Sequence, residues 1–212
     1  MKGSLPTEQA WQAVVEERAE LSALLANTDV KAWDQPSPCG DWTVKDVVAH
    51  LVVMAEAGNR YRFIARSALT DPRFHASIDK AARRLSAAVQ PHDLAARLGA
   101  ARNGRFVLPF IPPTAALGEV LVHRLDITDA LDLPAHAPDD RFRAVLETQR
   151  KLWFVFGVSR SIRTCRLVAT DANWSVGPAG GTTIEAPCEQ LVRIATGRQP
   201  LPSTRYESAA SP

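Results

Sequence analysis

The sequence predicts a mainly α protein, in which a helical bundle is followed by a small C-terminal α+β appendage of strands and one short helix. Apolar residues recur at helical spacing in long segments before Gly157, and an alternation typical of strands begins after it. The 212 residues are 46% hydrophobic and 23% charged, the balance of an ordinary globular protein with a core. Together these observations favour one large helical domain with a short extension.

Four long segments show the apolar spacing of amphipathic helices. The second of them opens at Thr43, which makes a capping box with Asp46 three residues later. Between the second and third segments lies an alanine-rich helical stretch that is interrupted at Pro91. The four main segments, which we expect to pack as one antiparallel bundle, are residues 8–25 (with Val14), 44–68 (with His50), 114–133 (with Glu119) and 139–157 (with Leu146).

The pattern changes after Gly157. A strand, a turn and a second strand are expected between residues 163 and 176, and residues 182–185 are expected to form a third strand. A short helix should then end just before Gly197, because glycine is favoured directly after a helix. We therefore expect a bundle, an appendage and a disordered tail rich in Ser and Pro, with boundaries at 1–157, 158–199 and 200–212.

Bulk properties exclude several classes of function. The net charge is only +2, and no cluster of Lys and Arg is dense enough to follow a nucleic-acid backbone, so nucleic acid is not an expected partner. Cys39, Cys165 and Cys188 are odd in number and scattered, which fits neither a disulfide framework nor a CxxC pair. The first residues do not resemble a secretory signal, and no apolar run is long enough to span a membrane. We expect a cytoplasmic protein.

Three residues on two apolar helices form the candidate metal site. Glu119 and His123 are four residues apart, which puts both side chains on one helix face. Carboxylate and neutral imidazole are ordinary zinc ligands, and three protein ligands with one open position is the pattern of catalytic zinc. His50 is the natural third ligand, because it lies in the middle of another apolar helix. The alternatives are an exposed Glu–His helix pair and a hydrogen-bonded core histidine.

Two stretches, PSPCGDWTVKDVVAHL and GEVLVHRLDITDAL, resemble the mycothiol-dependent maleylpyruvate isomerase family of the DinB-like superfamily. The resemblance implies a DinB-like up-down-down-up four-helix bundle, with zinc held by His50, Glu119 and His123. It also implies mycothiol, a low-molecular-weight thiol, as cofactor or co-substrate. The C-terminal stretch RLVATDANWSVG and the helix that ends in ATGR resemble the tail of the family's second domain, of which this chain keeps a remnant.

Other residues near these motifs are candidates for supporting roles. Asp126 shares the face of Glu119 and His123, so it is the expected catalytic residue, either orienting a ligand histidine or approaching the open metal position. The alternatives for Asp126 are an ion pair with Arg124 and a solvated carboxylate. Trp42 is expected to pack into the bundle, and Cys39, with no base beside it in the sequence, to be an ordinary loop thiol. The remaining candidates, expected to be rim or exposed residues, are Arg60, Tyr61, Arg105, His75, His92 and His136.

These features lead to one function and two alternatives. Zinc with an open position can hold a thiol as thiolate or activate a water molecule. The family resemblance favours the thiol, so the leading hypothesis is a zinc-dependent and mycothiol-dependent isomerase or thiol S-transferase acting on a small electrophile. A zinc hydrolase and a non-catalytic metal- or thiol-binding module are the alternatives. Expected partners are the thiol and the electrophile, with no membrane involved, and a homo-oligomer is left open.

Overall fold

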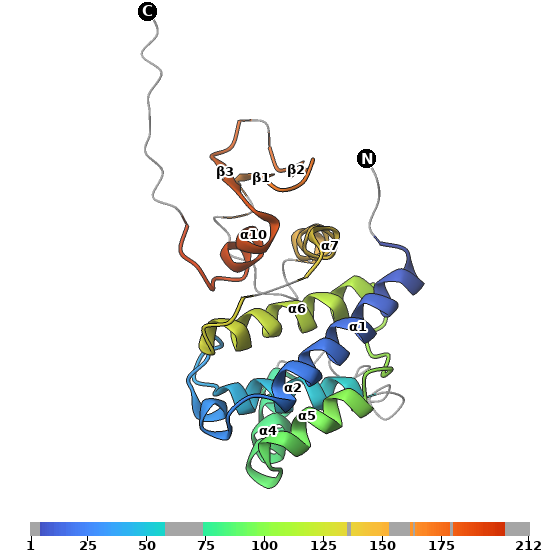
Figure 1. Ribbon diagram of the computed structural model, residues 1–212. Coiled ribbons are helices and arrows are strands. Elements are labelled where there is room, and N and C mark those ends of the chain that lie inside the picture. The colour runs from blue at the N-terminus through green and yellow to red at the C-terminus, as the bar shows by residue number, and fades with distance from the viewer. Residues whose placement is uncertain are drawn as a thin grey trace, which may run out of the picture.

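The computed structural model describes residues 5–57, 74–134, 137–152, 162, 164–178 and 180–201. It confirms the mainly α class with a small C-terminal sheet and a short last helix (Figure 1). The elements of the N-terminal part are α1 (Thr7–Ala26), the 3-10 helix η1 (Val30–Asp34), α2 (Val44–Glu56), α4 (Phe74–Ala88), α5 (Pro91–Ala100) and α6 (Pro113–Ala130). The later elements are α7 (Asp139–Lys151), β1 (Arg166–Ala169), β2 (Ser175–Val176), β3 (Thr183–Ala186) and α10 (Cys188–Ala195).

The bundle consists of α1, α2, α5 and α6. Helix α1 packs against α5 and α6, and α2 packs against the same two helices and against α4. The core between these helices is aliphatic, with fully buried side chains that include Leu21, Leu25, Leu51, Leu94, Leu98, Leu117 and Leu121. The fourth helix of the bundle is therefore the short α5, which begins at the predicted interruption, Pro91.

Helix α7, which contains Leu146, does not fill the bundle position that the sequence analysis gave it. It packs on α6 and on α10, so that α6 lies between the other bundle helices and the C-terminal elements (Figure 1). The reason lies in α6 itself, which is buried on every face from Thr114 to Leu117 and from Val120 to Thr128. A helix that is buried on all its faces needs neighbours on both sides. Helices α7 and α10 supply the second side.

The segment before α2 is held in a fixed loop. Pro36 and Thr43 form an isolated antiparallel bridge, and the buried Ser37 donates from both its backbone N–H and its hydroxyl to the carbonyl of Trp42, at 2.9 and 2.8 Å. Gly40 closes the turn with φ +63°, a conformation that residues with a Cβ rarely adopt. The predicted capping box of Thr43 and Asp46 is present in both directions. This loop therefore presents Cys39 and Trp42 at the start of α2.

The C-terminal elements form a small three-stranded sheet with the order β2-β1-β3. Strands β1 and β2 make the predicted antiparallel hairpin, and β3 pairs in parallel with β1. After α10, Gly197 has φ +75° and turns the chain. The expected continuation of α2 to residue 68 and most of the expected disordered tail, residues 202–212, lie outside the described residues.

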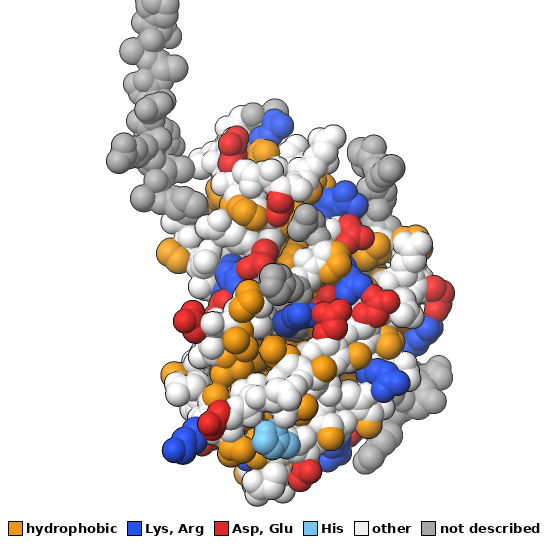
Figure 2. Space-filling view, viewed as in Figure 1, with side chains coloured by type: hydrophobic (Ala, Val, Ile, Leu, Met, Phe, Trp, Pro, Cys, Tyr) orange, Lys and Arg blue, Asp and Glu red, His pale blue; other side chains and the backbone are white. Residues whose placement is uncertain are grey.

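The surface carries both signs of charge. In the view of Figure 2, Lys and Arg side chains are interspersed with Asp and Glu, and no region of this face is purely basic. Among the described residues, no helix is both long and apolar enough to span a membrane.

Candidate metal centre

The structure brings His50, Glu119 and His123 together. Glu119 and His123 lie one turn apart on α6, and His50 reaches them from the middle of α2. Their ligand atoms all lie within 4.8 Å of one another. Both imidazoles face the same oxygen, because His50 Nε2 is hydrogen-bonded to Glu119 Oε1 and His123 Nε2 lies 3.5 Å from it. The i, i+4 spacing on one helix and the contact of α2 with α6 produce this convergence.

The donor set fits a divalent metal such as zinc. Ligands that surround zinc tetrahedrally at about 2.1 Å lie roughly 3.4 Å apart, close to the 3.5 Å between His123 Nε2 and Glu119 Oε1. His50 and Glu119 are in direct hydrogen-bond contact and would have to separate to share the ion. Both histidines are buried, whereas the side chain of Glu119 retains 28% of its exposure. Two imidazoles, one carboxylate and a partly open side are the composition of a catalytic rather than a structural zinc site.

Electrostatics keep Glu119 charged. Burial alone would raise the pKa of this carboxyl group, but its interactions with His123 and His50 outweigh burial and hold the pKa well below its usual range. For His123, burial acts to lower the pKa, but its interactions with Asp126, Cys39 and Glu119 raise the pKa well above the usual value. These interactions favour the protonated imidazole, so that metal binding at His123 is coupled to proton release.

Asp126 lies behind His123 rather than at the open side of the site. Its Oδ2 is 2.9 Å from His123 Nδ1, and its side chain is fully buried. Arg198, just after α10, donates to both carboxylate oxygens from Nε and Nη2, each at 2.9 Å. The alternative partner Arg124 instead pairs with Glu17 and Glu20 of α1. Asp126 is thus placed to orient the imidazole of His123.

Arg198 was not singled out from the sequence. It is 72 residues away from Asp126, and no helical or strand periodicity connects the two. The only local signal is its place directly after Gly197, where the chain leaves a helix and turns. Burial lowers the pKa of this guanidinium, yet its contacts with Asp126 outweigh burial and raise the pKa. The pair therefore stays ionised.

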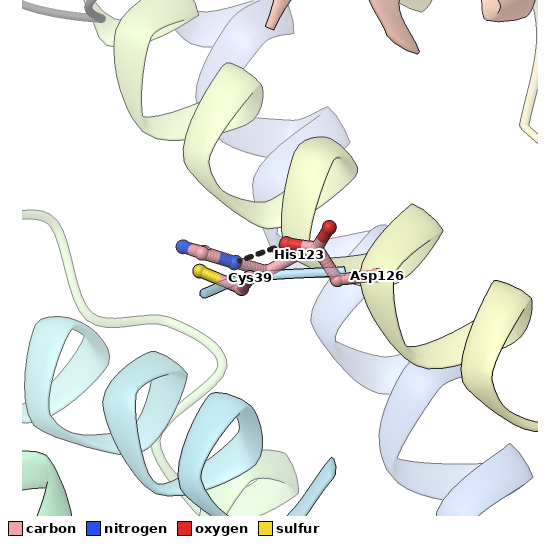
Figure 3. Close-up of side chains that lie close together, drawn as sticks. All are labelled: Cys39, His123 and Asp126. Atoms are coloured by element: carbon pink, nitrogen blue, oxygen red, sulfur yellow. Dashed lines mark hydrogen bonds and ion pairs between the residues drawn. The ribbon is translucent and has the colours of Figure 1, made fainter. Parts of the chain in front are cut away.

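Cys39 lies next to His123. The sulfur of Cys39 and the ligand atoms of His123 and Asp126 form a second group within 4.8 Å (Figure 3). This second group does not fit a metal, because both oxygens of Asp126 are already bonded to a cation, Arg198. The sequence offers no base beside Cys39, but the structure places the imidazole of His123 near its sulfur, from α6 far along the chain.

Trp42 forms a wall of the site. Its ring centroid lies 5.1 Å from that of His50 and 6.2 Å from that of His123, with the latter pair stacked at 27°. The ring is half-buried, and its Nε1 donates to Asp79 of α4 at 2.8 Å. Packing into the bundle, as expected, thus also brings the indole against both imidazoles.

A buried arginine of α1, Arg18, is a further neighbour that the sequence analysis missed. Its Nη1 donates to the carbonyl oxygens of Gly104 at 2.6 Å and Arg102 at 3.2 Å. Burial lowers the pKa of Arg18 to about 10, and the negative charge of Glu119 partly offsets this effect. Arg18 therefore adds positive charge near the candidate metal ligands.

The remaining candidates lie away from the site or outside the described residues. Arg105 pairs with Glu8 at 2.8 Å on the surface, and its guanidinium lies over the ring of Trp11. His92 is exposed, as expected, and bonds to the carbonyl of Thr28. Arg60, Tyr61, His136 and the side chain of His75 lie outside the described residues.

The sequence from residue 14 to residue 128 matches the profile of the mycothiol maleylpyruvate isomerase N-terminal domain. This match covers more than half of the chain and includes α2, most of α6 and all three candidate ligands. The chain belongs to this family. The family is one of enzymes, which confirms the expectation that the chain is an enzyme.

Two solved structures resemble most of the chain. They are the crystal structure of the mycothiol-dependent maleylpyruvate isomerase and that of a histidine-to-alanine variant of it. Each has a TM-score of 0.57 and 19% sequence identity, and covers 92% of this chain and 90% of its own. This likeness shows that the fold extends through the C-terminal elements. Among curated proteins, the sequence has no match.

Proposed function

We propose that this protein is a zinc-dependent, mycothiol-dependent isomerase that acts on a small electrophile, with zinc held by His50, Glu119 and His123. The observation that carries the proposal is the convergence of two imidazole nitrogens on one carboxylate oxygen at a partly open site. The family gives the thiol, since its profile and its solved members are described as mycothiol enzymes.

The residues of the chain support such chemistry in distinct ways. When bound, a divalent ion at this site would supply a Lewis acid that holds a thiol in its deprotonated form. Asp126 fixes the tautomer and direction of His123 through Nδ1, so that Nε2 points toward Glu119. Trp42 covers both imidazoles with its ring and limits access of water from that side. The positive charge of Arg18 beside Glu119 favours an anionic ligand.

Thiol S-transfer shares the first step with isomerisation, namely addition of the thiol to the electrophile. The two reactions differ in whether the sulfur leaves again or stays on the product. Hydrolysis is less well supported, because a hydrolase needs a carboxylate or histidine that is free to take a proton from water. Within the described residues, the second carboxylate of the site, Asp126, is committed to Arg198 and His123.

Calorimetry on the metal-loaded protein tests the proposal. Mycothiol should bind to the zinc-loaded chain more tightly than a small thiol such as cysteine, because the rest of the mycothiol molecule adds contacts beyond the metal–sulfur bond. Binding should strengthen as the pH rises toward neutrality, because the bound form is the thiolate and a proton is released. Glu119→Ala should abolish thiol binding together with metal binding.

The control is the same titration with metal-stripped protein. Equal affinity of mycothiol for the stripped and zinc-loaded chains would refute a thiol enzyme, and the hydrolase or a non-catalytic binding module would then take its place.

A further inference from the structure

Arg18 of α1 differs from the other buried arginines of the described residues. Arg124 and Arg193 each pair with two carboxylates. No carboxylate of the described residues forms an ion pair with Arg18, although its side chain is even more deeply buried, with 2% of its surface exposed. A buried charge that lacks a partner strongly destabilises a fold. The position of Arg18 therefore calls for an anion that the described part of the chain does not supply.

The guanidinium of Arg18 is engaged on one side only. Its Nη1 donates to the carbonyl oxygens of Arg102 and Gly104, at 3.2 and 2.6 Å, which holds the group in a definite orientation. Among the described residues, neither the fully buried Nε nor Nη2 has a hydrogen-bond acceptor. These two nitrogens form the edge that binds both oxygens of a carboxylate, as Arg198 does with Asp126. Arg18 thus presents a preoriented edge with two donors.

Arg18 lies beside the candidate metal centre. Gly104, which holds the guanidinium, packs directly on α2, since a Cβ at this glycine would lie 1.8 Å from the carbonyl oxygen of Ala55. Ala55 follows His50 by five residues, about 7.5 Å along the helix axis. The negative charge of Glu119 also reaches Arg18, where it partly offsets the effect of burial on the pKa. Arg18 and the candidate ligands thus belong to the same part of the bundle.

We propose that Arg18 is the residue that selects the electrophile, and that this substrate carries a carboxylate whose two oxygens bind Nε and Nη2 of the guanidinium. The inference rests on the proposed function, in which the sulfur of the thiol takes the open metal position. The electrophile then needs an anchor of its own, and Arg18 supplies one that is not a candidate metal ligand. A neutral molecule of the same shape is rejected, because it leaves the buried guanidinium without an anion.

Calorimetry with crotonate, a small unsaturated carboxylate, tests the proposal against crotonamide, which has the same shape without the charge. The zinc-loaded chain should bind crotonate at least about tenfold more tightly than crotonamide, as expected of a charge-assisted contact. Arg18→Met should lose this preference, and Arg18→Lys should keep only part of it, because an ammonium group keeps the charge but not the edge. Arg105→Met is the matched control and should keep the full preference, since Arg105 pairs with Glu8 on the surface.

The Nε–H group of Arg18 gives a readout that does not depend on the folding of a variant. In protein labelled with ¹⁵N-arginine, the NMR signal of this group should shift on addition of crotonate and stay in place with crotonamide. The Nε–H of Arg198 is the internal reference, because it already donates to Asp126 and should not move.

Three results would overturn the proposal: equal affinity for the acid and the amide, an unmoved Arg18 signal, and an undiminished preference in Arg18→Met. The third would mean that crotonate binds to the zinc alone. In metal-stripped protein, the preference should persist and still depend on Arg18. Failure of the proposed function looks different, because mycothiol would then not discriminate between zinc-loaded and stripped protein, while the Arg18-dependent preference for crotonate would remain.

Discussion

Two carboxylates on the same face of α6, Glu119 and Asp126, have opposite surroundings. Glu119 keeps 28% of its side-chain exposure, and its hydrogen-bonding partners are the two imidazoles. Asp126 is fully buried, and both of its oxygens are bonded to Arg198. His123 stands between them and directs one ring nitrogen to each. The same residue chemistry, two turns apart on one helix, therefore gives one group that is open to a ligand and one that is closed.

The difference shows that the partners of a carboxylate, more than its position on a helix, decide what it can do. A carboxylate that already forms a two-point pair with a guanidinium has little left to offer a metal ion. It can still orient a neighbouring imidazole through the remaining lone pair. Among the described residues, Glu119 contacts only imidazoles, which can release a proton. It can therefore accept a metal cation without breaking an ion pair to a guanidinium.

Removing a candidate ligand next to Glu119 should have the largest effect on metal content. The wild-type chain should hold about one zinc, and His123→Ala should lose most of it, because two of three protein ligands cannot retain zinc tightly. The matched control is His92→Ala, since His92 is exposed and bonds only to a backbone carbonyl. Atomic emission on purified proteins gives the stoichiometry. Equal zinc content in wild type and His123→Ala would contradict the assignment, because the metal would then not be bound at His50, Glu119 and His123.

Much of this geometry follows from local spacing and could be predicted. Glu119, His123 and Asp126 share a face because α6 is a regular helix, and the i, i+4 and i, i+3 relations hold for any such helix. The sequence predicts His50 as an inward-facing residue on an apolar helix, and α2 does pack on α6. The capping box of Thr43 and Asp46 is equally local and is confirmed.

What could not be predicted depends on chain segments that are distant in sequence. The contact of Arg198 with Asp126 and that of Cys39 with His123 join loops to α6 across 72 and 84 residues, and no periodicity records such contacts. The prediction that the helix with Leu146 completes the bundle is wrong for a related reason. Helix α5 is short, whereas the α7 segment is long and strongly patterned, yet tertiary packing placed α5 in the bundle. The boundary at residue 157 stays a prediction.

Removing the arginine partner of Asp126 should lower metal affinity without abolishing metal binding. Arg198→Met removes the two bonds that hold Asp126, so the imidazole of His123 loses its fixed direction. Loss of such an outer partner typically costs about 10- to 100-fold in metal affinity. Asp126→Asn should fall in the same range, because the amide keeps the shape but not the charge. Competition titration against a chromophoric chelator measures the affinity.

Arg105→Met is the control for the loss of a guanidinium, because Arg105 pairs with Glu8 on the surface away from the site. It should leave metal affinity unchanged. A loss of all metal in Arg198→Met would show that Asp126 is needed as much as a ligand is, and the contrast between the two carboxylates would disappear.

The smallest expected effect is that of Trp42→Phe. This variant tests how far metal binding depends on the indole ring beside His50 and His123. Phenylalanine keeps an aromatic face against His50 and His123 but loses the Nε1 bond to Asp79 of α4. One hydrogen bond of this kind contributes about 1 kcal/mol, so the urea midpoint should fall slightly and metal affinity should change by less than about tenfold. Asp79→Ala, which leaves the ring untouched but removes the acceptor together with an exposed pair to Arg83, should reproduce the fall in stability with no change in metal affinity. If Trp42→Phe instead lost its zinc as completely as His123→Ala, the indole itself would be required at the site, and the metal site would be defined by more than its three ligands.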